Sequence, residues 1–228
     1  MLKLKDVGFL VFLIISLVLF VIAFTSPKDI FIIDDFENGE IVEWKESGFA
    51  TISYTTVNTS SSENTAIAKI TISTNESTSK YGSFQKVINQ DWSNFKYGEI
   101  SFFIKLNDYY QKIYGVDLSF GDIVSGASQS NKANFFYRPT TNDWQEVKFK
   151  LYEHDSILGT LNYKNIQRIR FSIGYGDEFY KSNTTFNVYI DDIKLTGYSK
   201  KSIYLFISSL IFFVISLFII FFNKMSKG

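Results

Sequence analysis

The chain has 228 residues with 23 basic and 23 acidic side chains, and it contains no cysteine. Without cysteine it has neither disulfides nor thiolate metal sites, so a folded domain depends on its apolar core. The balanced charge argues against a nucleic-acid partner, because such a partner requires a basic face. The Ile, Lys and Asn bias, taken with the missing cysteine, favours an archaeal or low-GC bacterial cell envelope as the source.

The first element in chain order is an uncharged apolar run over residues 8–24. A helix of roughly 20 residues crosses about 30 Å of hydrocarbon, so we predict a transmembrane helix over 7–25 after a cytoplasmic N-terminus over 1–6. Lys3 and Lys5 before the run also suit a cleaved signal peptide. The run is long for a signal peptide and no small-x-small cleavage site follows it, so a retained signal anchor is preferred.

The middle of the chain, residues 28–200, is long enough for one domain of ordinary size. It consists of short apolar runs, alternating or aromatic, separated by Gly, Asn, Ser and Asp clusters. This pattern predicts an all-β domain, an antiparallel β-sandwich, with loops at Val57–Asn64 and Thr74–Lys80. The predicted strands are Phe31–Phe36, Phe49–Thr56, Thr65–Ser73, Gly82–Val87, Tyr97–Lys105, Tyr114–Phe120, Ala133–Tyr137, Gln145–Leu151, Ile166–Ile173 and Phe186–Leu195.

A second uncharged apolar run covers residues 203–222, followed by Lys224 and Lys227. We predict a second transmembrane helix there, with a cytoplasmic tail over 223–228. The positive-inside rule favours cytoplasmic termini by a small charge difference. The expected product is a two-pass protein of the cell membrane whose central domain is extracellular.

Several short motifs recur along the predicted sandwich. Asp-Asp-Phe-Glu at residues 34–37 opens it, with Trp44 following. The strand Ile100–Lys105 has the form Φ-x-F-x-Φ-K, where Φ is apolar, and a W-x-x-Φ strand begins at Trp144. Tyr-Ile-Asp-Asp-Ile at residues 189–193 closes the domain.

The order of these motifs resembles the galactose-binding-like jelly-roll superfamily. It is most similar to the carbohydrate-binding modules and to the complex I intermediate-associated protein type of domain. The resemblance covers nearly all of residues 31–197 and is more specific to a fold than to a function. It implies that Trp44 and Trp144 are core residues.

The resemblance also implies a structural Ca²⁺ where the first and last strands meet, and the matching residues are Asp35, Glu37 and Asp192. Ca²⁺ takes about six to eight oxygen ligands, which carboxylates and carbonyls supply. Side chains alternate along a strand, so at most one Asp of each acidic pair is expected to face the ion. The alternative is that these acids cap turns or prevent edge-to-edge pairing.

Sugar binding by such a domain relies on aromatic rings that stack on the apolar face of a pyranose. Tyr109 and Tyr110 are the exposed pair that we expect to bind a ligand, with Tyr114, Tyr137 and Arg138 as further groove residues. For each of these aromatic residues, packing in the core is the alternative.

Catalysis is hard to build from this sequence. The single histidine, His154, adjoins Asp155 and Ser156 in a polar loop, and no nucleophile-elbow glycines surround any serine. No phosphate loop, dinucleotide fingerprint or histidine metal cluster is present.

The sequence therefore predicts a non-catalytic module, held in the lipid bilayer, that binds a glycan or a cell-envelope protein. The alternative is a structural or assembly subunit of a larger membrane complex. Small polar residues in the second span, Ser208, Ser209 and Ser216, give that alternative some support because they let helices approach closely. A membrane-tethered hydrolase is the least favoured reading.

Overall fold

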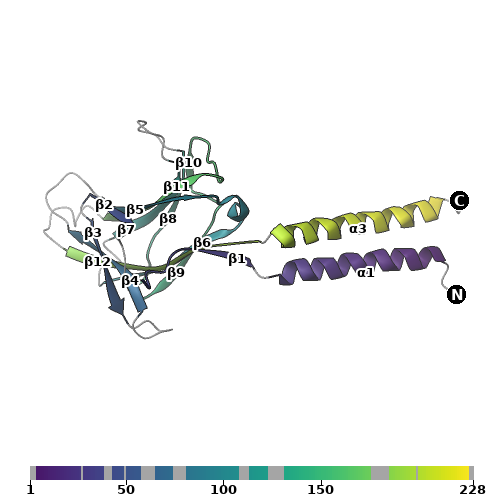
Figure 1. Ribbon diagram of the computed structural model, residues 1–228, viewed down its shortest axis with the longest axis horizontal. Coiled ribbons are helices and arrows are strands. Elements are labelled where there is room, and N and C mark those ends of the chain that lie inside the picture. Colours follow the sequence, from purple (N-terminus) through teal and green to yellow (C-terminus); the bar gives the residue numbers. More distant parts are fainter. Residues whose placement is uncertain are drawn as a thin grey trace. The chain divides into compact units, whose positions relative to one another are not determined.

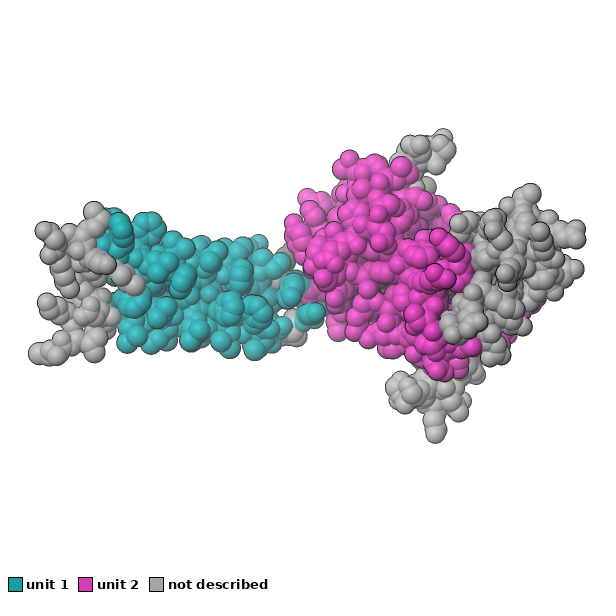
Figure 2. All heavy atoms as spheres, turned by 180° about the vertical axis from the view of Figure 1, so that it is seen from behind, with its two compact units in different colours: residues 1–29, 198–228 teal, residues 30–197 magenta. Residues whose placement is uncertain are grey.

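The computed structural model describes residues 4–26, 28–38, 43–48, 50–57, 65–73, 81–107, 113–122, 131–175, 185–198 and 200–225. These residues belong to two compact units. One comprises residues 1–29 and 198–228, and the other comprises residues 30–197 (Figure 2).

Two helices, α1 (Leu4–Thr25) and α3 (Lys200–Met225), make up most of the first unit. Each contains an apolar window long enough to cross a membrane by length and composition, and an N-terminal signal sequence has the same character. The rings of Phe12 and Phe212 lie 5.9 Å apart, and those of Phe20 and Phe206 lie 6.1 Å apart. Because residue numbers rise along one helix as they fall along the other, the two helices pack antiparallel.

A pair of serines joins the two helices. The hydroxyl of Ser16 donates to the carbonyl oxygen of Ser209, and the hydroxyl of Ser209 donates to the carbonyl oxygen of Ser16, each at 2.9 Å. Both side chains are buried. These reciprocal bonds need a close approach of the two backbones, which small side chains allow.

The second unit is a β-sandwich whose two layers are visible in Figure 1. Sheet I has the order β3-β4-β12-β6-β9, with β1 also paired to β12, and sheet II has the order β10-β8-β7-β11-β5-β2. The strands of sheet I are β1 (Lys28–Asp34), β3 (Ala50–Val57), β4 (Thr65–Ser73), β6 (Glu99–Leu106), β9 (Gln145–Lys150) and β12 (Thr185–Tyr198). The strands of sheet II are β2 (Trp44–Gly48), β5 (Tyr81–Gln90), β7 (Ile113–Gly121), β8 (Lys132–Tyr137), β10 (Ser156–Leu158) and β11 (Ile166–Tyr175).

The core fills the space between the sheets because every second side chain of each strand points inward. Phe84 and Phe171 stack with ring centroids 5.1 Å apart, and Phe102 from the opposite sheet meets Phe171 edge-on at 5.0 Å. Trp92, which precedes the short helix η1 (Ser93–Phe95), is fully buried against Phe120. The stability of the sandwich depends on this aromatic core and not on disulfides, because the chain has no cysteine.

The predicted antiparallel β-sandwich is confirmed, and each predicted strand has a counterpart. β1 pairs with β12, so the first and last strands are neighbours, as a jelly roll requires. The sequence does not predict β2 and β10, because both are short and neither shows a sustained alternation of apolar and polar residues. Of the predicted loops, residues 58–64 and 74–80 lie outside the described residues, and Val57 ends β3.

Candidate functional site

The side of sheet II that faces away from the core carries a concentration of polar, charged and aromatic groups. We call it the outer face. The strand registers align its residues in rows across β8, β7, β11 and β5. The row Phe136, Asp117, Ser172, Ser83 lies beside the row Asn134, Ser119, Arg170, Gln85, and next to that lies the row Lys132, Gly121, Arg168, Val87.

Two aromatic rings lie at the β7–β8 side of the outer face. Tyr114 is 62% exposed and Phe136 is 38% exposed, and their ring centroids are 5.6 Å apart. Gly115 makes room for this arrangement, because a Cβ at that position would overlap the Phe136 ring. The glycine thus lets Phe136 lie close over β7 and present an apolar surface beside Tyr114.

Two arginines of β11 lie across the same face. The Arg170 guanidinium donates through Nη2 to the Ser83 hydroxyl at 2.8 Å, and Arg168 donates through Nη1 to Oε1 of Gln85 at 3.2 Å. Both arginines are half-buried, and burial lowers the pKa of Arg170, with a further contribution from the neighbouring Arg168 charge. These contacts fix the planar donor groups in place.

Asp117 lies in β7, directly opposite Phe136 on β8 and Ser172 on β11. Burial raises the pKa of its carboxyl; the Asp155 charge adds to this, and the Lys132 charge opposes it. The face therefore combines exposed rings, fixed cationic donors and a partly desolvated carboxyl. Such a surface suits a ligand with both apolar faces and many hydroxyl groups.

The predicted ligand residues fall in different places. Tyr114 lies on the outer face, and Arg138 follows β8 and is exposed. Tyr137 lies on the opposite side of β8 from Phe136, where it packs against the core and its hydroxyl hydrogen-bonds to Gln145. Tyr109 and Tyr110 lie outside the described residues.

Sequence reasoning did not single out Phe136, Asp117, Arg168 or Arg170. A signal for the arginines was present, because Arg-Ile-Arg-Phe at residues 168–171 alternates polar and apolar side chains. That alternation places both arginines on one face of a strand, but it does not say which strands lie beside it.

Four of the five acidic side chains of the two motifs interact electrostatically, namely Asp35, Glu37, Asp191 and Asp192. Burial raises the pKa of Asp191 to about 6, and the charges of Asp192, Glu37 and Asp35 raise it further, against a backbone hydrogen bond from Asp192 that lowers it. Asp192 also forms an ion pair with Lys194 at 2.6 Å. Among the residues whose placement is described, no three His, Cys, Asp or Glu side chains converge closely enough to hold a metal ion. The structural Ca²⁺ on Asp35, Glu37 and Asp192 stays a prediction.

The first acidic residue of the opening motif has a structural role. Oδ2 of Asp34 accepts hydrogen bonds from the Trp44 indole and from the Lys86 ammonium, each at 2.8 Å. Burial opposes the charge of Lys86, but its bonds to Asp34 and Glu43 outweigh burial and raise its pKa overall. A polar recess of about 240 Å³ beside this network is lined by Asp34, Asp35, Glu43 and Lys86, among others. Its charged groups are largely bonded to one another, so the network holds β1 against β2 and β5.

Trp44 and Trp144 were expected in the core and His154 in a loop. Trp44 is buried in the core, whereas Trp144 is half-buried and lies outside it. The neighbours of His154 bond to β8: the Asp155 carboxylate accepts the backbone N–H of Phe136 at 2.6 Å, and the Ser156 hydroxyl accepts from the Asn134 side chain. Within the described part of the chain, Nδ1 of His154 has no hydrogen-bond partner.

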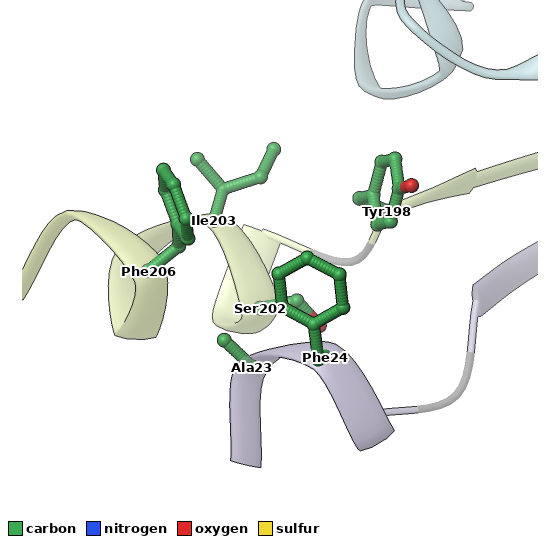
Figure 3. Close-up of a pocket in the computed structure, with 6 residues that line it drawn as sticks. All are labelled: Ala23, Phe24, Tyr198, Ser202, Ile203 and Phe206. Carbon is green, nitrogen blue, oxygen red and sulfur yellow. The ribbon is translucent and has the colours of Figure 1, made fainter. Parts of the chain in front are cut away.

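A recess in the helical unit has a different character (Figure 3). It is lined by Ala23 and Phe24 of α1, by Ser202, Ile203 and Phe206 of α3, and by Tyr198 at the end of β12. Its volume is about 270 Å³. The lining is almost wholly apolar, which suits a hydrocarbon chain and offers little to a hydroxylated ligand.

No protein-family model matches this chain, and no curated protein sequence matches it either. Solved structures do. A family 11 carbohydrate-binding module of a cellulosomal cellulase from Clostridium thermocellum is 20% identical, with a TM-score of 0.51, over 75% of this chain and 96% of that one. A family 30 carbohydrate-binding module is 17% identical, with a TM-score of 0.53, over 74% of this chain and 99% of that one. The sandwich has the fold of a carbohydrate-binding module.

An exo-β-agarase also shares the fold, at 16% identity and a TM-score of 0.53. The likeness covers 73% of this chain but only 24% of the enzyme. At these identities the likenesses show a common fold and no common function.

Proposed function

We propose that this protein is a membrane-anchored, non-catalytic module that binds a glycan or another component of the cell envelope through the outer face. The observation that carries the proposal is the outer face itself. On a sandwich with the fold of carbohydrate-binding modules, the exposed Phe136 ring lies in register with Asp117 and Ser172, and the exposed Tyr114 ring lies beside it. Rings stack on the apolar face of a sugar, and the polar groups select its hydroxyls.

The proposed anchor is the α1–α3 pair. Both helices have the length and apolar character of membrane spans, and the serine bonds between them are worth more where water is absent. In the proposed topology the sandwich is extracellular and both termini are cytoplasmic. The non-catalytic assignment is supported by the engagement of Asp155 and Ser156 away from His154.

The test uses the full chain in phosphatidylcholine nanodiscs on a glycan array. Tyr114→Ala and Phe136→Ala are each expected to weaken binding to a retained glycan by roughly three- to tenfold, because each removes one stacking ring. Tyr152→Ala is the matched control, since Tyr152 is exposed but pairs with Tyr97 outside the outer face. Binding that survives both outer-face substitutions would contradict the proposal.

The alternative, an assembly subunit of a membrane complex, now has less support from the serines of α3. Ser209 bonds to α1, and the Ser216 hydroxyl donates to the carbonyl oxygen of Phe212 in its own helix. Purification in mild detergent distinguishes the two functions. Stoichiometric membrane partners, together with a chain that retains no glycan, would favour the subunit.

A further inference from the structure

The two arginines of the outer face have a geometry that selects a class of ligand. Arg168 and Arg170 lie two residues apart on one side of β11, roughly 7 Å along the strand. Arg168 bonds to Gln85 rather than to its direct partner Val87, and Arg170 bonds to Ser83 rather than to its direct partner Gln85. Both guanidinium groups therefore extend in the same diagonal direction, towards β5.

This parallel placement keeps two like charges together at a half-buried position. Guanidinium groups stay protonated at neutral pH, so the mutual repulsion is not relieved by loss of a proton. The Arg170 bond goes to a neutral hydroxyl, which orients the group without adding a negative charge beside it. An anion bound there would offset the repulsion and accept two parallel N–H bonds from one guanidinium.

The position of the arginines relative to the rings matches an oligosaccharide. From Phe136 on β8 to Ser83 on β5 there are three strand spacings, roughly 14 Å. A sugar stacked on Tyr114 and Phe136 would thus be followed, a residue or two along the chain of sugars, by one lying over Arg170. Asp117 lies nearer the rings, where its carboxyl would meet the hydroxyls of the stacked sugar.

We propose that the outer face binds an acidic glycan, in which a carboxylate or sulfate group of one sugar is held by Arg170 with Arg168 beside it. This inference rests on the proposed glycan-binding function and names the class of glycan. A neutral glycan would use the same rings and hydroxyl contacts but would form no charge-assisted bond with Arg170.

The experiment compares pairs of glycans that share a sugar backbone, where one member carries acidic groups and the other is neutral. Full-length protein in phosphatidylcholine nanodiscs is titrated calorimetrically with oligogalacturonate and with its methyl ester, and with a sulfated galactan oligosaccharide and its unsulfated form. We expect at least one acidic member to bind about ten- to a hundredfold more tightly than its neutral counterpart, because charge-assisted bonds are the stronger ones. That advantage should shrink as sodium chloride is added. The two pairs together show whether carboxylate or sulfate is the preferred group.

Substitutions at Arg170 locate the effect. Arg170→Gln should remove most of the preference for the acidic member and leave binding of the neutral member nearly unchanged, and Arg170→Lys should retain part of it. Lys164→Gln is the charge-matched control, because Lys164 is an exposed loop cation away from the outer face. Equal binding of the charged and neutral members, or an unchanged preference in Arg170→Gln, overturns the inference and leaves the proposed function standing.

Failure of the proposed function gives a different result, namely that no member of either pair binds. Circular dichroism shows whether Arg170→Gln folds. If it does not, the native chain alone tests the inference, through its preference for acidic over neutral glycans and the salt dependence of that preference.

Discussion

At the residue scale, Asp34 connects the opening acidic motif to Trp44, ten residues later in the chain. Its Oδ1 accepts the backbone N–H of Phe36 at 3.0 Å, which turns the chain out of β1, while Oδ2 accepts from Trp44 and Lys86. The Phe36 backbone has a φ of 55°, an unusual conformation for a bulky residue that this local bond supports. The motif residues therefore hold one another in place.

Asp34→Ala is expected to destabilise the protein by about 2–4 kcal/mol, because it leaves a buried indole N–H without its acceptor and removes the buried counter-ion of Lys86. Among the described residues, Lys86 then keeps only the exposed Glu43 carboxylate and the Ile33 carbonyl oxygen. The side chains of Asp34 and Lys86 are 9% and 13% exposed, so solvent screens this pair little. The free energy of unfolding from denaturant titration measures the effect. Glu153→Gln, which breaks the exposed Lys150–Glu153 pair, should leave the unfolding midpoint almost unchanged. An equal shift in both variants would refute the role given to Asp34.

The Asp191 carboxyl makes stability depend on pH. Because its pKa rises from 3.8 to about 6 in the folded state, the folded protein binds more protons than the unfolded chain between these values. Stability should therefore fall as the pH rises from about 4 to about 6 and stay lower above that. Asp191→Asn is expected to remove this part of the fall and, without calcium, to be more stable than the native protein at neutral pH by no more than about 3 kcal/mol.

If the predicted Ca²⁺ is bound, Asp191→Asn is expected to lower the stability of the protein instead of raising it. A cation bound among Asp35, Glu37 and Asp192 would stabilise the native protein by mass action, and it would stabilise Asp191→Asn less because one negative charge is gone. Thermal unfolding of the full chain, with calcium and after chelation, measures both. A native midpoint that chelation does not move would count against the ion.

At the element scale, the proposed retention of α1 rests on its pairing with α3. Ser16 and Ser209 form two hydrogen bonds between the helices, each from a hydroxyl to a backbone carbonyl oxygen, and two pairs of phenylalanine rings are in contact. A signal peptide that is removed would not need such complementary contacts with α3. Loss of α1 would remove both of these bonds from Ser209, which is buried in the helix pair.

Cysteine cross-linking tests this pairing cleanly because the native chain has no cysteine. The two serine hydroxyl oxygens lie 3.4 Å apart, so Ser16→Cys with Ser209→Cys should form a disulfide in membranes under mild oxidation. Ser16→Cys with Phe221→Cys should not, since the second site lies roughly 18 Å farther along α3. A mature chain that begins after residue 25, or equal cross-linking of both pairs, would rule out the retained, paired α1.

At the scale of the whole molecule, the sequence by itself determined the architecture. Two uncharged runs at the ends and alternating runs between them are local periodicities, and each is set by residues within one element. The two helices and the predicted strands of the sandwich follow from these patterns, whereas the pairing of the first and last strands was implied by the resemblance to jelly-roll domains. The short strands β2 and β10 were not predicted because their pairing depends on neighbouring strands rather than on their own composition.

Only the tertiary structure decided which side chains share a surface. Phe136, Asp117, Ser172 and Ser83 form one row because strand registers join segments far apart in the sequence. Neighbouring residues of one strand separate for the same reason, so that Phe136 reaches the outer face while Tyr137 packs against the core. Side-chain alternation divides a strand into two faces, but the face that meets solvent, and the neighbours it meets there, depend on how the sheets pack.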